Sequence, residues 1–300
     1  MVELQNSRVL ISGARGLVGT ELTKQLEEAG HTVLRLVRRP ARSANESEWD
    51  PSHGTIDSAI IDSVDAVINL SGASTGRLPW TSSYKNEILS SRITTTGTLA
   101  AAIARSATPP ASFLSASAVG FYGNRPGETL TEDEAKGTGF LSDVVAEWEN
   151  AAQPAAATSR VVTFRTGLVV GRGGAFTPLG LATRFGLAAR VGRGTQVWPW
   201  VSLFDEAAAI RHVLSSELAG VVNVAGPMPA TSFDVTTSLA AAMHRWHVLA
   251  IPEWVVRAGL GEAGRELLLP DQRVVPARLL ADGFVFTHPT IGSAISAVWG

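Results

Sequence analysis

The sequence predicts an α/β fold in which a largely parallel sheet is covered by helices on both faces. Short apolar segments alternate with amphipathic ones over the first 166 residues. Residues 8–12 form an apolar run that ends at glycine, and residues 17–29 follow with apolar side chains at helical spacing. This alternation indicates a doubly wound sheet, because parallel strands need a crossover helix between them.

The later segments repeat this order up to residue 166. We expect further strands at 31–37, 65–70, 112–116 and 160–166, and helices at about 80–105 and 141–152. After residue 167, glycine, proline and tryptophan become frequent and the alternation ends. We therefore expect a main domain over 1–166 and a smaller, substrate-binding domain over 167–300, with parts of 201–225 returning to the main sheet.

The composition limits the classes of partner that we expect. The 300 residues carry a net charge of −2, so nothing indicates a basic surface for nucleic acid or anionic lipid. There is no cysteine, which excludes disulfides, thiol chemistry and cysteine-bound zinc, and we expect no metal site. The first residues lack the long apolar run of a signal peptide, and no uncharged run is long enough to span a bilayer. We expect a cytoplasmic protein with no membrane or nucleic-acid partner.

The stretch SGARGLVG at 12–19 predicts the binding of a dinucleotide. Gly13, Gly16 and Gly19 follow a predicted strand and open a predicted helix, which is the context that gives such a glycine pattern its meaning. The glycines allow a tight turn, close approach of the backbone to a pyrophosphate, and close packing of helix on sheet. The N–H groups of the helix N-terminus, at Leu17 and Val18, then face the anion. We interpret residues 1–166 as a Rossmann-type domain; the alternative is a glycine loop that only lets the helix pack tightly.

The tip of the second predicted strand favours NADP(H) over NAD(H). An NAD site usually has an acidic residue there, bonded to the ribose 2′-hydroxyl. This tip instead reads Val37-Arg38-Arg39-Pro40, and Arg15 lies in the glycine loop. Guanidinium groups suit a 2′-phosphate, because their forked N–H groups match its oxygens. The alternative is a solvated basic patch.

Several motifs along the chain resemble those of the extended short-chain dehydrogenase/reductase superfamily, the group of sugar-nucleotide epimerases and dehydratases. The resemblance implies that the cofactor is contacted by the glycine loop, by the segment Asn69-Leu70-Ser71-Gly72, and by the segment around Thr166 and Gly167. It also implies that the strand of SASAVGFYG (115–123) carries Ser115 beside the cofactor and an active-site serine at Ser117. From its position alone, Asp50 is expected to bind the adenine amino group.

A narrower resemblance extends over the whole chain. Pro79-Trp-Thr81, Ser91-Arg-Ile93 and the C-terminal run 261–286 are similar to a subgroup of uncharacterised epimerase-family proteins, described as predicted nucleoside-diphosphate-sugar epimerases. Members of the superfamily normally use Tyr-x-x-x-Lys, in which the lysine cation lowers the pKa of the phenol, about 10 when unperturbed.

That dyad is missing from this sequence. Its positions fall on Phe140 and Val144, and neither of the two tyrosines, Tyr84 and Tyr122, has a lysine four residues later. We predict Ser117 and Tyr122 as the catalytic residues; the weaker candidates are Lys85, Glu132 and Asp143.

Two functions remain open on this sequence. One is hydride transfer on a carbonyl or sugar-nucleotide substrate with an atypical proton donor. The other is a catalytically silent protein that binds NADPH and acts as a sensor or scaffold. We expect a small-molecule substrate, for which a sugar nucleotide is one candidate; a homodimer is a further option.

Overall fold

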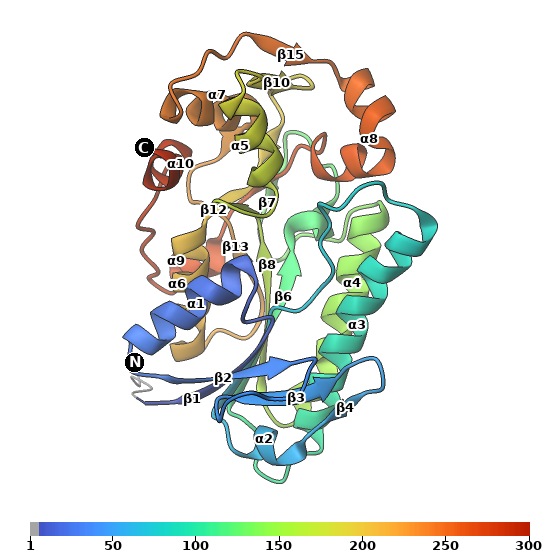
Figure 1. Ribbon diagram of the computed structural model, residues 1–300, viewed down its shortest axis with the longest axis vertical. Coiled ribbons are helices and arrows are strands. Elements are labelled where there is room, and N and C mark those ends of the chain that lie inside the picture. The colour runs from blue at the N-terminus through green and yellow to red at the C-terminus, as the bar shows by residue number, and fades with distance from the viewer. Residues whose placement is uncertain (1–5) are drawn as a thin grey trace.

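An eight-stranded sheet forms the centre of the protein in the computed structural model, which describes residues 6–300 (Figure 1). In spatial order its strands are β13 (Gly220–Val224), β8 (Arg160–Thr166), β6 (Ser112–Ala118), β5 (Ala66–Asn69), β1 (Arg8–Ser12), β2 (Thr32–Val37), β3 (Glu46–Asp50) and β4 (Thr55–Ile56). All neighbours pair in parallel except β3 and β4, which are antiparallel. The order reverses at β1, and in such sheets this is where the crevice for a ligand lies.

Helices cover both faces of the sheet (Figure 1). One face is packed by α1 (Leu17–Glu28) and α6 (Leu203–Ser215), and the other by α3 (Ser82–Ala104) and α4 (Phe140–Ala152), with the short α2 (Ser58–Asp62) and the 3-10 helices η1 (Val119–Tyr122) and η2 (Gln153–Ala157) nearby. The sequence of β1 explains the two layers: Val9 and Ile11 join the core with α1 and α6, whereas Leu10 joins the core with α3. Alternate side chains of a strand point to opposite faces, so a strand between two helical layers is apolar throughout.

The C-terminal lobe lies over the carboxyl ends of the strands. It is built from pairs of short strands, β9 (Leu168–Val170) with β12 (Trp200–Ser202), β10 (Ala189–Val191) with β15 (Leu249–Ile251), and β11 (Val197–Trp198) with β14 (Ala230–Thr231). Its helices are α5 (Phe176–Arg184), α7 (Ser232–Ala242), α8 (Glu253–Leu267) and α10 (Ile291–Trp299). Trp198 and Trp200 are buried in the core of this lobe. Near it, β16 (Arg273–Val274) pairs with β7 (Thr129–Leu130), and α9 (Ala277–Ala281) packs beside β13.

The α/β class predicted from the sequence is confirmed, and the predicted strands and helices start and end within about two residues of the observed ones; β6, for example, continues two residues beyond its predicted end. The return of the chain to the sheet occurs at β13. The sequence analysis missed α2, β3 and β4; β3 has the sequence ESEWD, in which only Trp49 is buried and apolar. The boundary at residue 167 stays a prediction. None of the helices described is long and apolar enough to cross a membrane.

Candidate functional site

The glycine loop joins β1 to α1 at the reversal point of the sheet. Gly13 has a φ of +74°, and a Cβ on it would lie 2.8 Å from the backbone carbonyl carbon and oxygen of Leu70. A Cβ on Gly19 would lie 2.3 Å from the carbonyl oxygen of Gly13. Glycine at 13 therefore lets the loop approach the backbone of Leu70, and glycine at 19 lets α1 pack against the loop. Leu17 and Val18 form its first turn, whose N–H groups have no acceptor within the helix.

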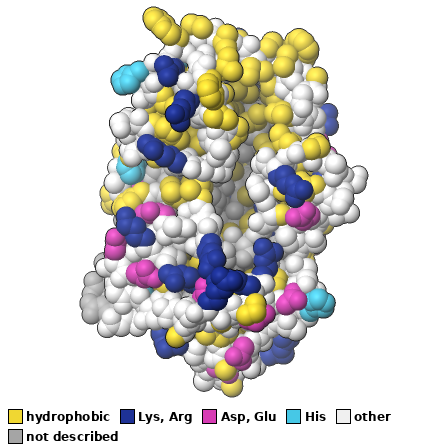
Figure 2. Space-filling model, viewed as in Figure 1, with side chains coloured by type: hydrophobic (Ala, Val, Ile, Leu, Met, Phe, Trp, Pro, Cys, Tyr) yellow, Lys and Arg dark blue, Asp and Glu magenta, His cyan; other side chains and the backbone are white. Residues whose placement is uncertain are grey.

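An arginine cluster lies beside this loop at the tip of β2. Arg39 forms a forked pair with Glu46 of β3, with Nη1–Oε2 and Nη2–Oε1 distances of 2.8 and 2.7 Å. Arg15 reaches the same carboxylate at 3.1 Å, and Arg38 is exposed beside them. Figure 2 shows Lys and Arg side chains gathered below a hollow in this face of the molecule. Two guanidinium groups on one carboxylate, with exposed Arg38 next to Arg39 in the chain, leave a positive site.

Glu46 is an acid that the sequence analysis did not place at this site. Hydrogen bonds from the Arg39 side chain and the Arg42 N–H lower its pKa to about 2, so it is ionised at neutral pH. Its side chain is only 8% exposed, and both of its oxygens accept from arginine. Glu46 therefore orients Arg15 and Arg39, and both oxygens are already engaged by arginine rather than free for a ribose hydroxyl.

Asn69 holds the loop that follows β5. Its Oδ1 accepts from Ser12 Oγ at 2.6 Å and from the Ser71 N–H at 3.2 Å, and its Nδ2 donates to Thr96 Oγ1 on α3 at 2.8 Å. Ser115 of β6 lies at the edge of hydrogen-bond range of the same Nδ2, at 3.5 Å. These bonds fix the backbone of Ser71 and Gly72 beside the glycine loop.

Asp50, at the end of β3, is already hydrogen bonded within its own turn. Oδ1 accepts from Ser52, and Oδ2 lies 2.7 Å from His53 Nδ1. Hydrogen bonds from Ser52 and then His53 lower its pKa to about 2. An adenine amino group would have to share these oxygens, and the role of Asp50 stays a prediction.

Thr166 and Gly167 lie at the carboxyl end of β8. Thr166 Oγ1 donates to Glu206 Oε1 of α6 at 2.7 Å, and Glu206 is 1% exposed. Burial raises the pKa of Glu206 to about 8, so its carboxyl is protonated at neutral pH. A Cβ on Gly167 would lie 2.7 Å from the Pro199 carbonyl oxygen, so this backbone arrangement requires glycine at position 167.

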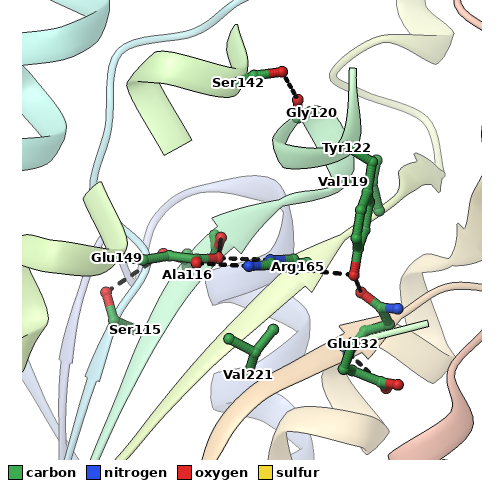
Figure 3. A network of polar contacts seen from close by, with 12 residues as sticks. Ser115, Ala116, Val119, Gly120, Tyr122, Glu132, Ser142, Glu149, Arg165 and Val221 are labelled. Carbon is green, nitrogen blue, oxygen red and sulfur yellow. Dashed lines mark hydrogen bonds and ion pairs between the residues drawn. The ribbon is translucent and has the colours of Figure 1, made fainter. Parts of the chain in front are cut away.

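The two predicted catalytic residues lie in a buried polar network. Figure 3 shows Tyr122, Arg165 and Glu149 of this network. Ser117 Oγ donates to Glu149 Oε1 of α4 at 2.6 Å, and Arg165 Nε and Nη2 each lie 2.8 Å from oxygens of Glu149. Tyr122 donates to Asn223 Oδ1 at 2.7 Å and accepts from Arg165 Nη1 at 3.0 Å. The guanidinium carbon of Arg165 lies 3.4 Å from the centre of the Phe121 ring.

Ser117 and Tyr122 were predicted as the catalytic residues, and the structure places both side chains in the interior. Ser117 is 3% exposed and Tyr122 is fully buried, and burial raises the pKa of Tyr122. Both hydroxyls are engaged with neighbouring side chains, so neither proton points into open space. Of the weaker candidates, Glu132 is also buried and accepts from the Asn223 N–H, and Asp143 pairs with Lys136 at the surface.

The positions of the missing dyad are packed into an apolar cluster between α3 and α4. Phe140 and Val144 contact this cluster, which includes Tyr84 and Ile88. Lys85 of α3 reaches over this cluster, and its Nζ lies 4.3 Å from the centre of the Phe140 ring. A charge over a ring face is a favourable cation–π contact.

Helix α8 of the C-terminal lobe completes this region. It is broken at Gly261, which has a φ of +56°, and Glu262 follows with both carboxylate oxygens 2.8 Å from Lys85 Nζ. One turn later, Glu266 accepts from the Leu141 N–H at the start of α4. Burial raises the pKa of Glu266. The sequence analysis missed both acids, although the segment that carries them was singled out.

The structure thus gathers most of the predicted cofactor residues at the carboxyl ends of five neighbouring strands. Those at β1, β2 and β5 are Gly13, Arg15, Gly16, Leu17, Val18, Gly19, Arg38, Arg39, Asn69, Leu70, Ser71 and Gly72, and those at β6 and β8 are Ser115, Thr166 and Gly167. Within residues 6–300 no group of three or more His, Asp or Glu side chains is placed to hold a metal ion.

Comparison with known proteins gives a consistent family. The NAD dependent epimerase/dehydratase family matches residues 9–225, and a domain of unknown function, DUF1731, matches residues 251–298. The chain is 41% identical over 291 residues to the epimerase family protein ML0860 of Mycobacterium leprae, covering 96% of this chain and 94% of that protein. It is 33% identical over 298 residues to human SDR39U1, covering 97% and 99%.

Solved structures agree with this. The crystal structure of human SDR39U1 with NADPH has a TM-score of 0.89 at 32% identity, covering 97% of this chain and 98% of that one. A structure described as the nucleoside-diphosphate sugar epimerase from Corynebacterium glutamicum has a TM-score of 0.81 at 33% identity, covering 99% of this chain and 59% of that one. The resemblance read from the motifs is confirmed: the chain belongs to the NAD-dependent epimerase/dehydratase family, in the group of epimerase family proteins that includes SDR39U1.

Proposed function

We propose that the protein is an NADP(H)-dependent oxidoreductase or epimerase of the extended short-chain dehydrogenase/reductase type, acting on a carbonyl or sugar-nucleotide substrate. The observation that carries the proposal is the cluster of Arg15, Arg38 and Arg39 beside the glycine loop. These groups would hold the 2′-phosphate, and the first turn of α1 would hold the pyrophosphate. The NADPH named in the human SDR39U1 structure supports the same cofactor for this chain.

The proton would come from Lys85. When bound, NADPH supplies a hydride to the carbonyl carbon of the substrate. The carbonyl oxygen then needs a proton, and unperturbed phenol and ammonium groups are acids of similar strength, with pKa values of about 10 and about 10.4. Lys85 Nζ, held by Glu262 over Phe140, would donate that proton and regain one from solvent.

Ser117 and Tyr122 would act as positioning residues. Their hydroxyls hold Glu149 and Arg165 in a single arrangement at the carboxyl ends of β6 and β8. A network in which each buried group is hydrogen bonded fixes the backbone around it. It would thereby set the position of the strand ends that face the nicotinamide.

A second function is favoured by one observation. Phe140 and Val144 put hydrocarbon at both positions where the superfamily has its proton-handling dyad. A protein that binds NADPH and turns nothing over, as a sensor or scaffold, would need no group there.

Two measurements separate these proposals. Fluorescence titration of the purified chain should give tighter binding of NADPH than of NADH, by roughly tenfold or more for the added charge-assisted bonds; a preference for NADH would contradict the arginine argument. NADPH oxidation is then followed with a panel of aldehydes, ketones and sugar nucleotides. Turnover of any of them supports the enzyme, whereas binding without turnover of any supports the sensor.

A further inference from the structure

Large apolar side chains are exposed around the strand pair β10–β15 of the C-terminal lobe. Trp246 is 83% exposed and Trp254 is 71% exposed, and all three residues of β15 are exposed as well. Figure 2 shows hydrophobic side chains over the end of the molecule at which Figure 1 places β10 and β15. The two indole rings alone expose roughly 300 Å², which is more than the scattered single apolar residues that are normal on a protein surface.

The pairing of β10 with β15 brings these residues together. The two strands are parallel, with Ala189 opposite Leu249 and Val191 opposite Ile251. The segments that lead into the two strands therefore lie side by side at one end of the pair. These segments carry four exposed apolar residues, Phe185, Leu187, Trp246 and Val248. At the other end, Trp254 lies in the first turn of α8, which follows β15 directly.

Arginines lie among the apolar residues of this surface. Residues 168–202 contain four arginines and no acidic residue. Arg184 and Arg245 each precede an exposed aromatic residue in the chain, and Arg190 is the middle residue of β10. All three are exposed, and none of them forms an ion pair within residues 6–300. The surface is therefore both apolar and positive.

This combination fits the surface of an anionic lipid bilayer. Tryptophan rings bind at the boundary between headgroups and acyl chains, and basic side chains are attracted by anionic headgroups. A second copy of this chain fits less well, because a two-fold contact through the same surface would bring arginines of both copies together. Single-stranded nucleic acid also fits less well, because bases stack on aromatic rings and gain nothing from exposed Leu187, Val248 or Ile251.

We propose that the apolar residues around β10–β15, together with Arg184, Arg190 and Arg245, form a docking surface for the headgroup region of a bilayer that contains anionic lipid. The net charge of −2 and the lengths of the apolar runs led the sequence analysis to expect no membrane partner. A surface assembled by strand pairing from 184–190 and 245–254 changes neither quantity. Its positive charge is offset in the net charge by acidic residues elsewhere in the chain.

Vesicle flotation with the full chain tests the proposal. The vesicles contain phosphatidylcholine alone or an equal mixture of phosphatidylcholine and phosphatidylserine. We expect wild type to bind the mixture at least about tenfold more tightly, and added salt to weaken this binding, because exposed charges are screened. The double variant Trp246→Ser/Trp254→Ser should lose at least about tenfold in affinity for the mixture. Arg184→Gln should lose about fivefold, the contribution of one basic residue near an anionic surface.

Val285→Ser and Arg105→Gln are the matched controls. Val285 is exposed between two residues of the core around α6, and Arg105 is exposed at the end of α3. Both should bind vesicles as wild type does, and thermal melting checks that each variant is folded.

Three results would overturn the proposal. The first is that wild type binds neither vesicle, or binds both alike. The second is equal binding of wild type and the double tryptophan variant to the mixed vesicle. The third is a wild-type dimer in sedimentation, lost in the double tryptophan variant and formed without any binding to vesicles, which would assign the surface to a second copy of the chain.

Discussion

The ammonium group of Lys85 lies 4.3 Å from the centre of the Phe140 ring. Lys85 belongs to α3 and Phe140 begins α4, so the cation reaches from one helix to the first turn of the other. Its partner Glu262 comes from the C-terminal lobe. By the resemblance read from the motifs, Phe140 stands at the position of the dyad's tyrosine, and we propose Lys85 as the proton donor there.

Replacing Lys85 by Met should abolish most turnover while leaving NADPH affinity within about threefold of wild type, since the change removes the proton donor and leaves the arginine cluster intact. A general acid typically contributes roughly 10²–10⁴-fold to a rate. The measurement is kcat with the best substrate of the panel, beside an NADPH titration. Lys136→Met, which breaks the exposed pair with Asp143, is the control. Wild-type turnover by Lys85→Met would remove Lys85 from the mechanism.

Arg39→Gln should weaken NADPH binding by roughly 10- to 100-fold and change NADH binding little, because charge-assisted bonds to a phosphate are worth about 1.5–3 kcal/mol. Fluorescence titration with both nucleotides measures the ratio. Arg35→Gln, within the strand β2 that precedes Arg39, removes a guanidinium whose partner is Glu27 and should keep the preference for NADPH. Equal losses for NADPH and NADH would mean that Arg39 supports the fold and not the 2′-phosphate.

Gly19→Ala should destabilise the protein by more than about 2 kcal/mol and abolish NADPH binding, because the new Cβ would lie 2.3 Å from the Gly13 carbonyl oxygen. Gly97→Ala is a matched control within a helix, since a Cβ at Gly97 meets nothing within 4 Å. That change should stabilise α3 by about 0.5–1 kcal/mol. Urea unfolding of both variants checks the pair, and similar effects of the two would show that the glycine loop tolerates a side chain.

Glu206→Gln should raise stability at neutral and alkaline pH. The pKa of Glu206 is about 8 in the folded protein, above its ordinary 4.5, so folding takes up a proton between these values. The free energy of unfolding of wild type therefore falls as pH rises through this range, by about 1.4 kcal/mol per unit at most, and Gln removes that loss. Urea unfolding at pH 5, 7 and 8.5 should show a difference that is small at pH 5 and grows to roughly 3 kcal/mol or more. A difference that does not depend on pH would show that Glu206 is ionised in the folded state; exposed Glu147→Gln is the control.

Tyr122→Phe should cost about 1–3 kcal/mol of stability, because it leaves Asn223 Oδ1 and Arg165 Nη1 buried without their partner. Ser117→Ala should cost less, since Glu149 keeps its forked pair with Arg165. Both should lower kcat only modestly if the two residues position the strand ends. A loss of turnover above about 100-fold with normal stability would return them to the role of proton donors.

The central sheet could be predicted because apolar runs of β1, β5, β6 and β8 are buried on both faces and leave a plain signal in the sequence. Strand β3 has no such apolar run. Its charged residues Glu46 and Glu48 occupy a strand near the edge of the sheet, and Trp49 is its single buried side chain. Because β3 was not predicted, the contact of Glu46 with Arg39 was not predicted either. That contact depends on the pairing of β3 with β2 and not on spacing along the chain.

The cofactor half of the site was predictable for a related reason. Its glycines and arginines lie within one βαβ unit, where the distance along the sequence nearly fixes the distance in space. The proposed catalytic half was not. Lys85, Phe140 and Glu262 come from three different helices, Lys85 and Glu262 lie 177 residues apart, and no local pattern brings them together. Ser117 and Tyr122 lie near the carboxyl end of β6, as their motif predicted. Their hydrogen bonds to Glu149 and Arg165 arise from tertiary packing, which the local sequence does not show.

Helix α8 is broken at Gly261. After the break, Glu262 contacts Lys85 of α3, and Glu266 accepts from the N–H of Leu141 in the first turn of α4. The last fifty residues therefore contact the helices of the dinucleotide-binding part of the chain directly. A truncated protein ending before residue 251 would keep its glycine loop and arginines, yet it would lose the counter-ion of Lys85 and the acceptor at the start of α4. Residues 251–298, which match a domain of unknown function, thus supply two carboxylates to the helices that flank the proposed site.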